Sequence, residues 1–196
     1  MNYPRFNVLG NQSDVPIGNI GDNRMVQGLG FPLIPVSQGS DTPYAGPGTV
    51  LRAANLADQT PAGLNVPLQL TFGAAQGGPA DAVQLSSAGV VTVNRAGVYQ
   101  VSINMYVQRT TNPGTAVLSF RALVNGVQAG NAVGLQLEDV TQTHFQQVTY
   151  TQSLSQGALL TWEMLRDPSG QNDGRLDAFT TVWGASPSAL LQILKY

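Results

Sequence analysis

The sequence predicts an all-β protein, built as a sandwich, a jelly roll or a barrel. Apolar and polar residues alternate along Gly97–Gln108, which is the period of a strand with one apolar face. From Thr49 onward, turn residues interrupt the chain about every ten residues, as they do between the short strands of sandwiches and barrels. No stretch between these breakers keeps a helical period long enough for an ordinary helix. We therefore expect about eight to ten strands.

The strand predicted at Gly97–Gln108 organises the domain. Its odd positions are apolar and include Tyr99, Val101 and Ile103, whereas its even positions are mostly polar and include Tyr106. Because side chains alternate between the two faces of a strand, the odd positions need a second layer of structure to cover them.

Other strands are predicted where apolar residues alternate between turn sequences, namely at Val50–Ala54, Val66–Phe72, Ala82–Leu85, Val90–Val93, Ala116–Val124, Phe145–Leu154, Ala158–Arg166, Phe179–Trp183 and Ala189–Tyr196. The same alternation predicts a core that contains Val101, Ile103, Met105, Leu118, Phe120, Val148, Leu160 and Trp162. Asn125-Gly126 predicts a tight hairpin, because both residues tolerate positive φ. The Gly-interrupted segment Val127–Leu137 stays open between strand and loop.

Residues 1–48 differ from residues 49–196, which form the predicted domain. Pro and Gly recur throughout residues 1–48, and such spacing excludes a helix of useful length. Two interpretations remain: a free leader, or an extended arm whose apolar clusters dock on a partner. In the second interpretation the anchoring residues are Val8, Leu9, Ile17, Phe31, Leu33 and Ile34.

The composition excludes several function classes. Only 10% of the residues are charged and the net charge is -2, so the surface suits permanent packing against other chains. The arginines are scattered without a basic stripe, which disfavours nucleic acid as a partner. No apolar run is long enough to span a membrane, and no secretory signal is expected at the start of the chain. The absence of cysteine excludes disulfides.

The chain offers few candidates for catalysis or metal binding, and we expect neither an enzyme nor a cofactor. His144 is the only histidine, and a residue at the start of a strand is a better interpretation than a catalytic base. Glu138-Asp139 and the loop from Asp167 to Asp173 offer oxygen ligands for Ca²⁺, but polar turns explain the same residues. Trp162 and Trp183 are interpreted as core or interface residues, with sugar-stacking platforms as the alternative.

Three short motifs resemble the tumour necrosis factor and C1q-like globular heads. Gly97–Val101, after the strand Val90–Val93, resembles the Gly-x-Tyr centre from which the long strand of those heads begins. Ala122–Gly126 resembles their Asn-Gly hairpin tip, and Leu154–Leu160 resembles their later Leu, Gly, strand segment. The resemblance covers residues 49–196.

Two features depart from the pattern of the heads. Gly157-Ala158 stands where they have Gly-Asp, and Phe179–Gly184 and Ala189–Tyr196 compete for the role of the last strand.

The resemblance implies a single C1q/TNF-like jelly roll that forms a homotrimer around a threefold axis and acts as a binding module. Its trimer and core strand residues would be Tyr99, Val101, Ile103, Tyr106 and Trp162.

The arm and the cysteine-free, weakly charged sequence indicate a virion component of a bacteriophage, by analogy of fold and composition. The expected function is a capsid decoration (cement) protein or head fibre, attached through the arm to other virion proteins. The alternative is a receptor-binding tail or fibre tip that recognises a host surface glycan.

Overall fold

The computed structural model describes residues 48–76, 81–110 and 113–196. The chain divides into two compact units, residues 1–45 and Gly46–Tyr196, and the described residues all belong to the second. The anchoring residues predicted in the arm lie outside the described residues; they are Val8, Leu9, Ile17, Phe31, Leu33 and Ile34.

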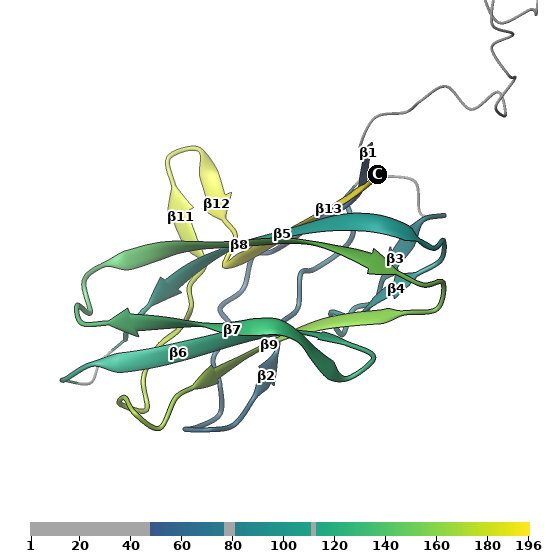
Figure 1. Cartoon of the computed structure of the whole chain (residues 1–196). Helices are drawn as coiled ribbons and strands as arrows, with labels where there is room; N and C mark the ends of the chain where they lie inside the picture. Colours follow the sequence, from purple (N-terminus) through teal and green to yellow (C-terminus); the bar gives the residue numbers. More distant parts are fainter. Residues whose placement is uncertain (1–47, 77–80, 111–112) are drawn as a thin grey trace, which may run out of the picture. The chain divides into compact units, whose positions relative to one another are not determined.

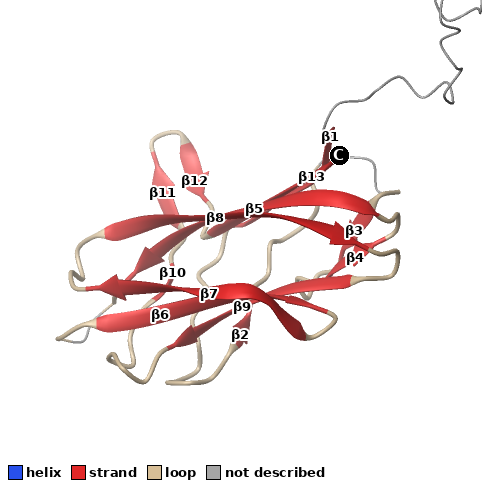
Figure 2. Cartoon of the chain, in the orientation of Figure 1, coloured by secondary structure: helices blue, strands red, loops and turns tan. Residues whose placement is uncertain are grey.

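The second unit is a sandwich of two antiparallel sheets that face each other (Figures 1 and 2). Sheet A has the strand order β1 (Gly48–Asn55), β13 (Ala189–Lys195), β5 (Gly97–Gln108) and β8 (Thr143–Leu154), and the short β10 (Arg175–Leu176) pairs with the end of β5. Sheet B has the order β3 (Val83–Leu85), β4 (Val91–Val93), β9 (Leu159–Arg166), β6 (Ala116–Val124) and β7 (Val127–Leu137), and β2 (Leu68–Gln69) pairs with β9. The strands β11 (Phe179–Thr181) and β12 (Gly184–Ser186) form a separate hairpin.

The connections make this sandwich a jelly roll. The chain passes from β4 in sheet B to β5 in sheet A, returns to β6 and β7, crosses again to β8, and returns to β9. The long strands therefore pair mostly with strands distant in sequence, as β5 does with β8 and β13. Repeated crossing between two sheets is the jelly-roll topology, so the predicted fold class is confirmed.

The apolar faces of the two sheets meet in the core. Seven of the eight predicted core residues are buried; they are Val101, Ile103, Met105, Leu118, Phe120, Leu160 and Trp162. Val148 is only partly buried, because β8 lies at the edge of sheet A. Phe72 adds an edge-to-face contact with Trp162, with ring centroids 5.4 Å apart.

The hairpin predicted at Asn125-Gly126 is confirmed. Asn125 and Gly126 have φ of 52° and 77° and join β6 to β7, so the ambiguous segment Val127–Leu137 is a strand. The strand predicted at Val66–Phe72 is shorter than expected: it comprises Leu68–Gln69, and the Leu70 amide still donates to the Trp162 carbonyl at 2.8 Å. The Thr71 amide donates to Oε1 of Gln59 at 2.8 Å instead of to a neighbouring strand.

The structure also decides between the two candidates for the last strand. β13 lies between β1 and β5 in the middle of sheet A, so Ala189–Tyr196 closes the fold. The prediction of a strand through Phe179–Trp183 is wrong in part, because β11 ends at Thr181 and Trp183 lies in the turn that follows. Trp183 is 96% exposed and is therefore no core residue.

Candidate functional site

The four long strands of sheet A present an outer face that is almost free of charge. Its exposed positions alternate with the buried ones on β1, β13, β5 and β8, and they are mainly Gln, Ser, Thr, Asn, Leu and aromatic residues. Arg52 is the only charged side chain that these four strands place on this face. Solvated surfaces usually carry charges on about a quarter of their residues or more, so the composition of this face favours contact with another protein.

Three aromatic rings form a cluster at one end of this face. The Tyr106 ring centroid lies 5.4 Å from that of Phe145 on the paired strand β8, and 5.2 Å from that of Phe179 on β11. Tyr106 and Phe179 meet edge to face at 89°, a favourable geometry for aromatic pairs. Phe145 is 55% exposed. The aromatic cluster, Tyr106, Phe145 and Phe179, therefore presents apolar surface to solvent and holds the β11–β12 hairpin against sheet A.

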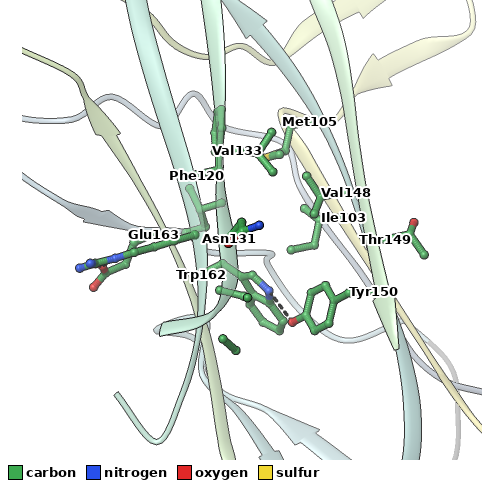
Figure 3. Close-up of a pocket in the computed structure, with 15 residues that line it drawn as sticks. Ile103, Met105, Phe120, Asn131, Val133, Val148, Thr149, Tyr150, Trp162 and Glu163 are labelled. Atoms are coloured by element: carbon green, nitrogen blue, oxygen red, sulfur yellow. Dashed lines mark hydrogen bonds and ion pairs between the residues drawn. The ribbon is translucent and has the colours of Figure 1, made fainter. Parts of the chain in front are cut away.

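A pocket opens at one side of the sandwich, between the edge strands β7 and β8 (Figure 3). Its volume is about 220 Å³. Sheet A contributes Ile103, Val148 and Tyr150, and sheet B contributes Phe120, Val133 and Trp162. We call this the edge pocket. Its walls are the part of the core that the edge strands leave uncovered.

A bulge in β7 shapes the mouth of the edge pocket. Phe120 pairs with Val133 and Ala122 pairs with Ala129, so three residues of β7 face one residue of β6. These three, Gly130 to Ala132, are exposed, and Gly130 has φ of +75°. Bulges of this kind bend an edge strand and interrupt its pairing, which leaves the two edges apart at this point.

One hydrogen bond crosses the gap between the sheets at the edge pocket. Nε1 of Trp162 on β9 donates to the Tyr150 hydroxyl on β8 at 3.0 Å, as Figure 3 shows. Burial raises the pKa of Tyr150 to about 12, and the hydrogen bond from Trp162 opposes this only in part. The hydroxyl is therefore neutral at physiological pH and satisfies the indole N–H in an otherwise apolar wall.

The residues predicted for the trimer and core strand separate into two groups. Tyr99, Val101, Ile103 and Trp162 are buried in the core, where they stabilise the fold. Burial raises the pKa of the Tyr99 hydroxyl, which donates to the Arg95 carbonyl. Tyr106 alone lies on the outer face of sheet A, in the aromatic cluster.

Two candidates for catalysis or metal binding, His144 and Asp139, lie on strand β8 and in the loop before it. His144 lies on β8 opposite Val107, and its Nε2 has no hydrogen-bond partner among the described residues. Within those residues no three His, Asp or Glu side chains gather as a metal site would require. Asp139 accepts from the backbone and hydroxyl of Thr141, and these bonds lower its pKa.

The loop that was considered for Ca²⁺ is instead tied to a buried arginine. Arg109 is 1% exposed, and its Nε lies 3.3 Å from Oδ2 of Asp173. The same guanidinium donates to the carbonyls of Gly114 and Glu138. Oδ1 of Asp173 accepts from the amide and hydroxyl of Thr110. The carboxylate of Asp173 therefore has its bonds within the protein, so Asp173 cannot act as a free ligand.

Sequence reasoning missed Phe145, Phe179 and the edge pocket. Along β8, alternation places Phe145 on one face of the strand and Val148 and Tyr150 on the other. This alternation was a usable signal that Phe145 is an exposed aromatic residue. The contact between Phe179 and Tyr106 joins residues far apart in the chain, and the sequence carries no comparable signal for it.

Within the described residues no helix is present that could cross a membrane. No protein-family model matches the chain, and no curated protein matches it.

Solved structures similar to the chain include the Eiger tumour necrosis factor from S. frugiperda and murine APRIL, the latter at pH 8.0 and at pH 5.0. Each is 12% identical over 76% of this chain, with a TM-score of 0.42. The match covers 92% of the Eiger chain and 98% of each APRIL chain. The fold assignment rests on the strand order of the chain itself.

Proposed function

We propose that this chain is a non-enzymatic structural protein whose jelly roll associates into a homotrimer through the outer face of sheet A. The observation that carries the proposal is the aromatic cluster on a sheet face whose four long strands carry one charged side chain, Arg52. The short strand β10 adds Arg175 at the end of the face, where Asp58 and Asp177 pair with it. The centre of a protein–protein interface is depleted in charged residues and enriched in aromatic residues. The outer face of sheet A has this composition.

The outer face of sheet B differs in a way that supports this choice of face. It carries an ion pair between Arg121 on β6 and Glu163 on β9, with 2.6 Å between nitrogen and oxygen. It also carries Asp167 beside Ser119. This ion pair lies within the long strands of sheet B, whereas the ion pairs of Arg175 lie at the end of sheet A. The association is therefore assigned to the uncharged centre of sheet A.

The number of copies follows from the resemblance of Gly97–Val101 to the heads of the tumour necrosis factor and C1q families, which are trimers. In a ring of three copies, each copy contacts one neighbour through one surface and the other neighbour through a different surface. Each copy must therefore offer two different surfaces. The outer face of sheet A and the open edge at β7 and β8 are two such surfaces.

The finer proposal places the trimer in a bacteriophage virion, as a capsid decoration protein or head fibre anchored by residues 1–48. The composition supports it: the chain has no cysteine, few charges and a long Gly- and Pro-rich segment before the jelly roll. Mass spectrometry of purified particles tests this placement, because decoration requires many copies per particle and a tail tip requires few. Absence of the protein from particles would contradict it.

The test of association is a charge placed on the outer face of sheet A. Phe145→Asp removes an exposed ring from the aromatic cluster, so the fold should survive and the trimer should not. Sedimentation equilibrium should give three copies for the native chain and one for the variant.

Leu159→Asp is the matched control, because Leu159 is a half-exposed apolar residue on the outer face of sheet B. This variant should remain a trimer. A native chain that stays monomeric at micromolar concentration would contradict the proposal.

A second candidate function is recognition of a host glycan by a fibre tip, and Trp183 favours it. A nearly fully exposed indole on a projecting hairpin has the geometry of a platform for stacking sugar rings. Glycan-array binding that disappears in Trp183→Ala would support this function.

A further inference from the structure

The tip of the β11–β12 hairpin is the most exposed apolar group among the described residues. Val182 is 97% exposed and Trp183 is 96% exposed. The hairpin projects from the outer side of sheet A, away from sheet B (Figure 1). An indole of this kind buries about 150–250 Å² when it is covered, so a tip that stays in water leaves a large stabilising contribution unused.

The turn is built to hold this tip in place. Thr181 pairs with Gly184, and Gly184 has φ of +117°. The Thr181 hydroxyl donates to the Gly184 carbonyl at 3.0 Å and accepts from the Trp183 amide at 3.2 Å. Tight hairpins usually carry Asn, Asp or Gly at the tip, whereas here the two tip residues are Val and Trp. Val182 and Trp183 can occupy the tip because the positive φ of the turn falls on Gly184.

The edge pocket has the size and chemistry to receive one large apolar side chain. Pockets for small-molecule ligands have volumes of about 300–1,000 Å³, and the edge pocket, at about 220 Å³, is smaller. Its walls are mainly aliphatic and aromatic, and the ion pair of Arg121 with Glu163 also lies in the lining. The amide side chain of Asn131 offers an acceptor for an indole N–H.

We propose that Trp183 of one copy inserts into the edge pocket of the neighbouring copy in the trimer. The inference rests on the proposed self-association and identifies the contact that determines its geometry. The hairpin is held by Phe179 against Tyr106, so it rises from the face assigned to association. The edge pocket opens beside β8, the edge strand of the same sheet. Each copy thus offers one projecting side chain and one recess, which is the pattern of a heterologous interface that closes into a ring.

The second copy is favoured over other occupants by the areas involved. A specific interface needs about 1,000 Å² or more in total. The aromatic cluster on a flat sheet face supplies part of this area, and the one indole buried at each interface adds about 150–250 Å². A free glycan ligand uses the indole but leaves the edge pocket empty.

Cross-linking tests the contact directly, because the chain has no cysteine of its own. Val182→Cys places a thiol beside Trp183, and Asn131→Cys places one at the mouth of the edge pocket. Mixed and treated with a short bis-maleimide, the two single variants should give a covalent dimer. One chain that carries both substitutions should give dimers and trimers. The control Ser87→Cys, in the exposed turn between β3 and β4, should not cross-link with Asn131→Cys.

The second measurement is the concentration at which the trimer is half dissociated. Trp183→Ala should raise it at least tenfold and leave the far-ultraviolet circular dichroism unchanged, because the tip contributes nothing to the core. Trp183→Phe should restore part of the loss. In the native trimer, the Trp183 fluorescence, taken as the difference between the native and Trp183→Ala spectra, should resist quenching by acrylamide.

The outcomes separate the two proposals. A native trimer with an unchanged dissociation concentration in Trp183→Ala, a quenchable Trp183 and no cross-link would overturn the inference and leave the proposed association standing. Glycan binding by such a trimer would assign Trp183 to recognition of a sugar. A native chain that is monomeric at all concentrations would overturn both proposals.

Discussion

Arg109 shows how a single buried charge determines the structure of one end of the molecule. Its guanidinium connects the end of β5 to Asp173, Gly114 and Glu138, which lie on three different loops. A buried charge without its partner is strongly destabilising, whereas the intact pair contributes little. The pair therefore makes the arrangement of these loops specific.

We expect Arg109→Met to lower the free energy of unfolding by about 3–5 kcal/mol, since the substitution leaves Asp173 buried without its cation. Arg95→Met is the control, because the ion pair of Arg95 with Asp81 is exposed and such pairs contribute about 1 kcal/mol or less. Denaturant unfolding at one protein concentration measures both variants, because association adds to apparent stability. Equal losses in the two variants would show that burial of Arg109 is unimportant.

Tyr150 gives the protein a defined sensitivity to alkali. Burial raises the pKa of Tyr150 from 10.0 to about 12 in the folded chain. The folded state therefore keeps the phenolic proton over a pH range in which the unfolded state loses it. The resulting stability is fully present below pH 10 and is lost as the pH rises from 10 to about 12.

Between pH 10 and 12 the free energy of unfolding should fall by about 2 kcal/mol less in Tyr150→Phe than in the native chain. At neutral pH the same variant should be about 1 kcal/mol less stable than the native chain, because Nε1 of Trp162 loses its acceptor. Tyr196→Phe removes the hydroxyl of an exposed tyrosine and is the control for the substitution itself. An unaltered slope in Tyr150→Phe would contradict the assignment.

At the scale of elements, two glycines with the same backbone conformation differ in their surroundings. Gly89 and Gly157 both have φ of +83°. A Cβ at Gly89 would overlap the carbonyl oxygen of Leu70, whereas a Cβ at Gly157 would meet nothing within 4 Å. The turn before β4 is thus packed against the segment after β2, and the turn before β9 is open.

Gly157→Ala should cost about 1–2 kcal/mol of unfolding free energy, the cost of a left-handed conformation at an ordinary residue. Gly89→Ala should cost roughly 1–3 kcal/mol more, because the backbone of Leu70 must also move. The difference between the unfolding free energies of the two variants, from thermal or denaturant unfolding, measures the effect of the contact between residue 89 and the Leu70 carbonyl alone. Similar costs would mean that the turn at Gly89 can shift freely.

At the scale of the whole molecule, the jelly roll and the segment before it are separate units. The compact unit Gly46–Tyr196 contains both sheets and the core. Deletion of residues 1–45 should therefore leave the melting temperature and the oligomeric state nearly unchanged, as calorimetry and sedimentation can measure. In the virion proposal, the truncated protein should no longer attach to particles that lack it.

Deletion of residues 1–55 is the matched control for this truncation. It also removes β1, which pairs with β13 and buries Leu51 and Ala53, so this shorter chain should fail to fold. A jelly roll that melts at a much lower temperature after loss of residues 1–45 alone would show that the first unit contributes to its stability.

The sequence by itself determined the strands and the side chains that face the core. The bounds of β5 and β6 follow from alternation and turn residues, because the side-chain period of a strand is a local property. The same period assigned Val101, Ile103 and Leu118 to the core before any pairing was known.

Only the tertiary structure decided which strands are neighbours, and with this the candidate site. Trp162 and Trp183 lie in similar short apolar segments, yet one is buried and the other is nearly fully exposed. The difference arises because β9 pairs with β4 and β6 inside sheet B, whereas β11 pairs only with β12. The edge pocket and the Arg109–Asp173 pair depend in the same way on contacts between residues distant in the chain. Alternation along one strand carries no information about such contacts.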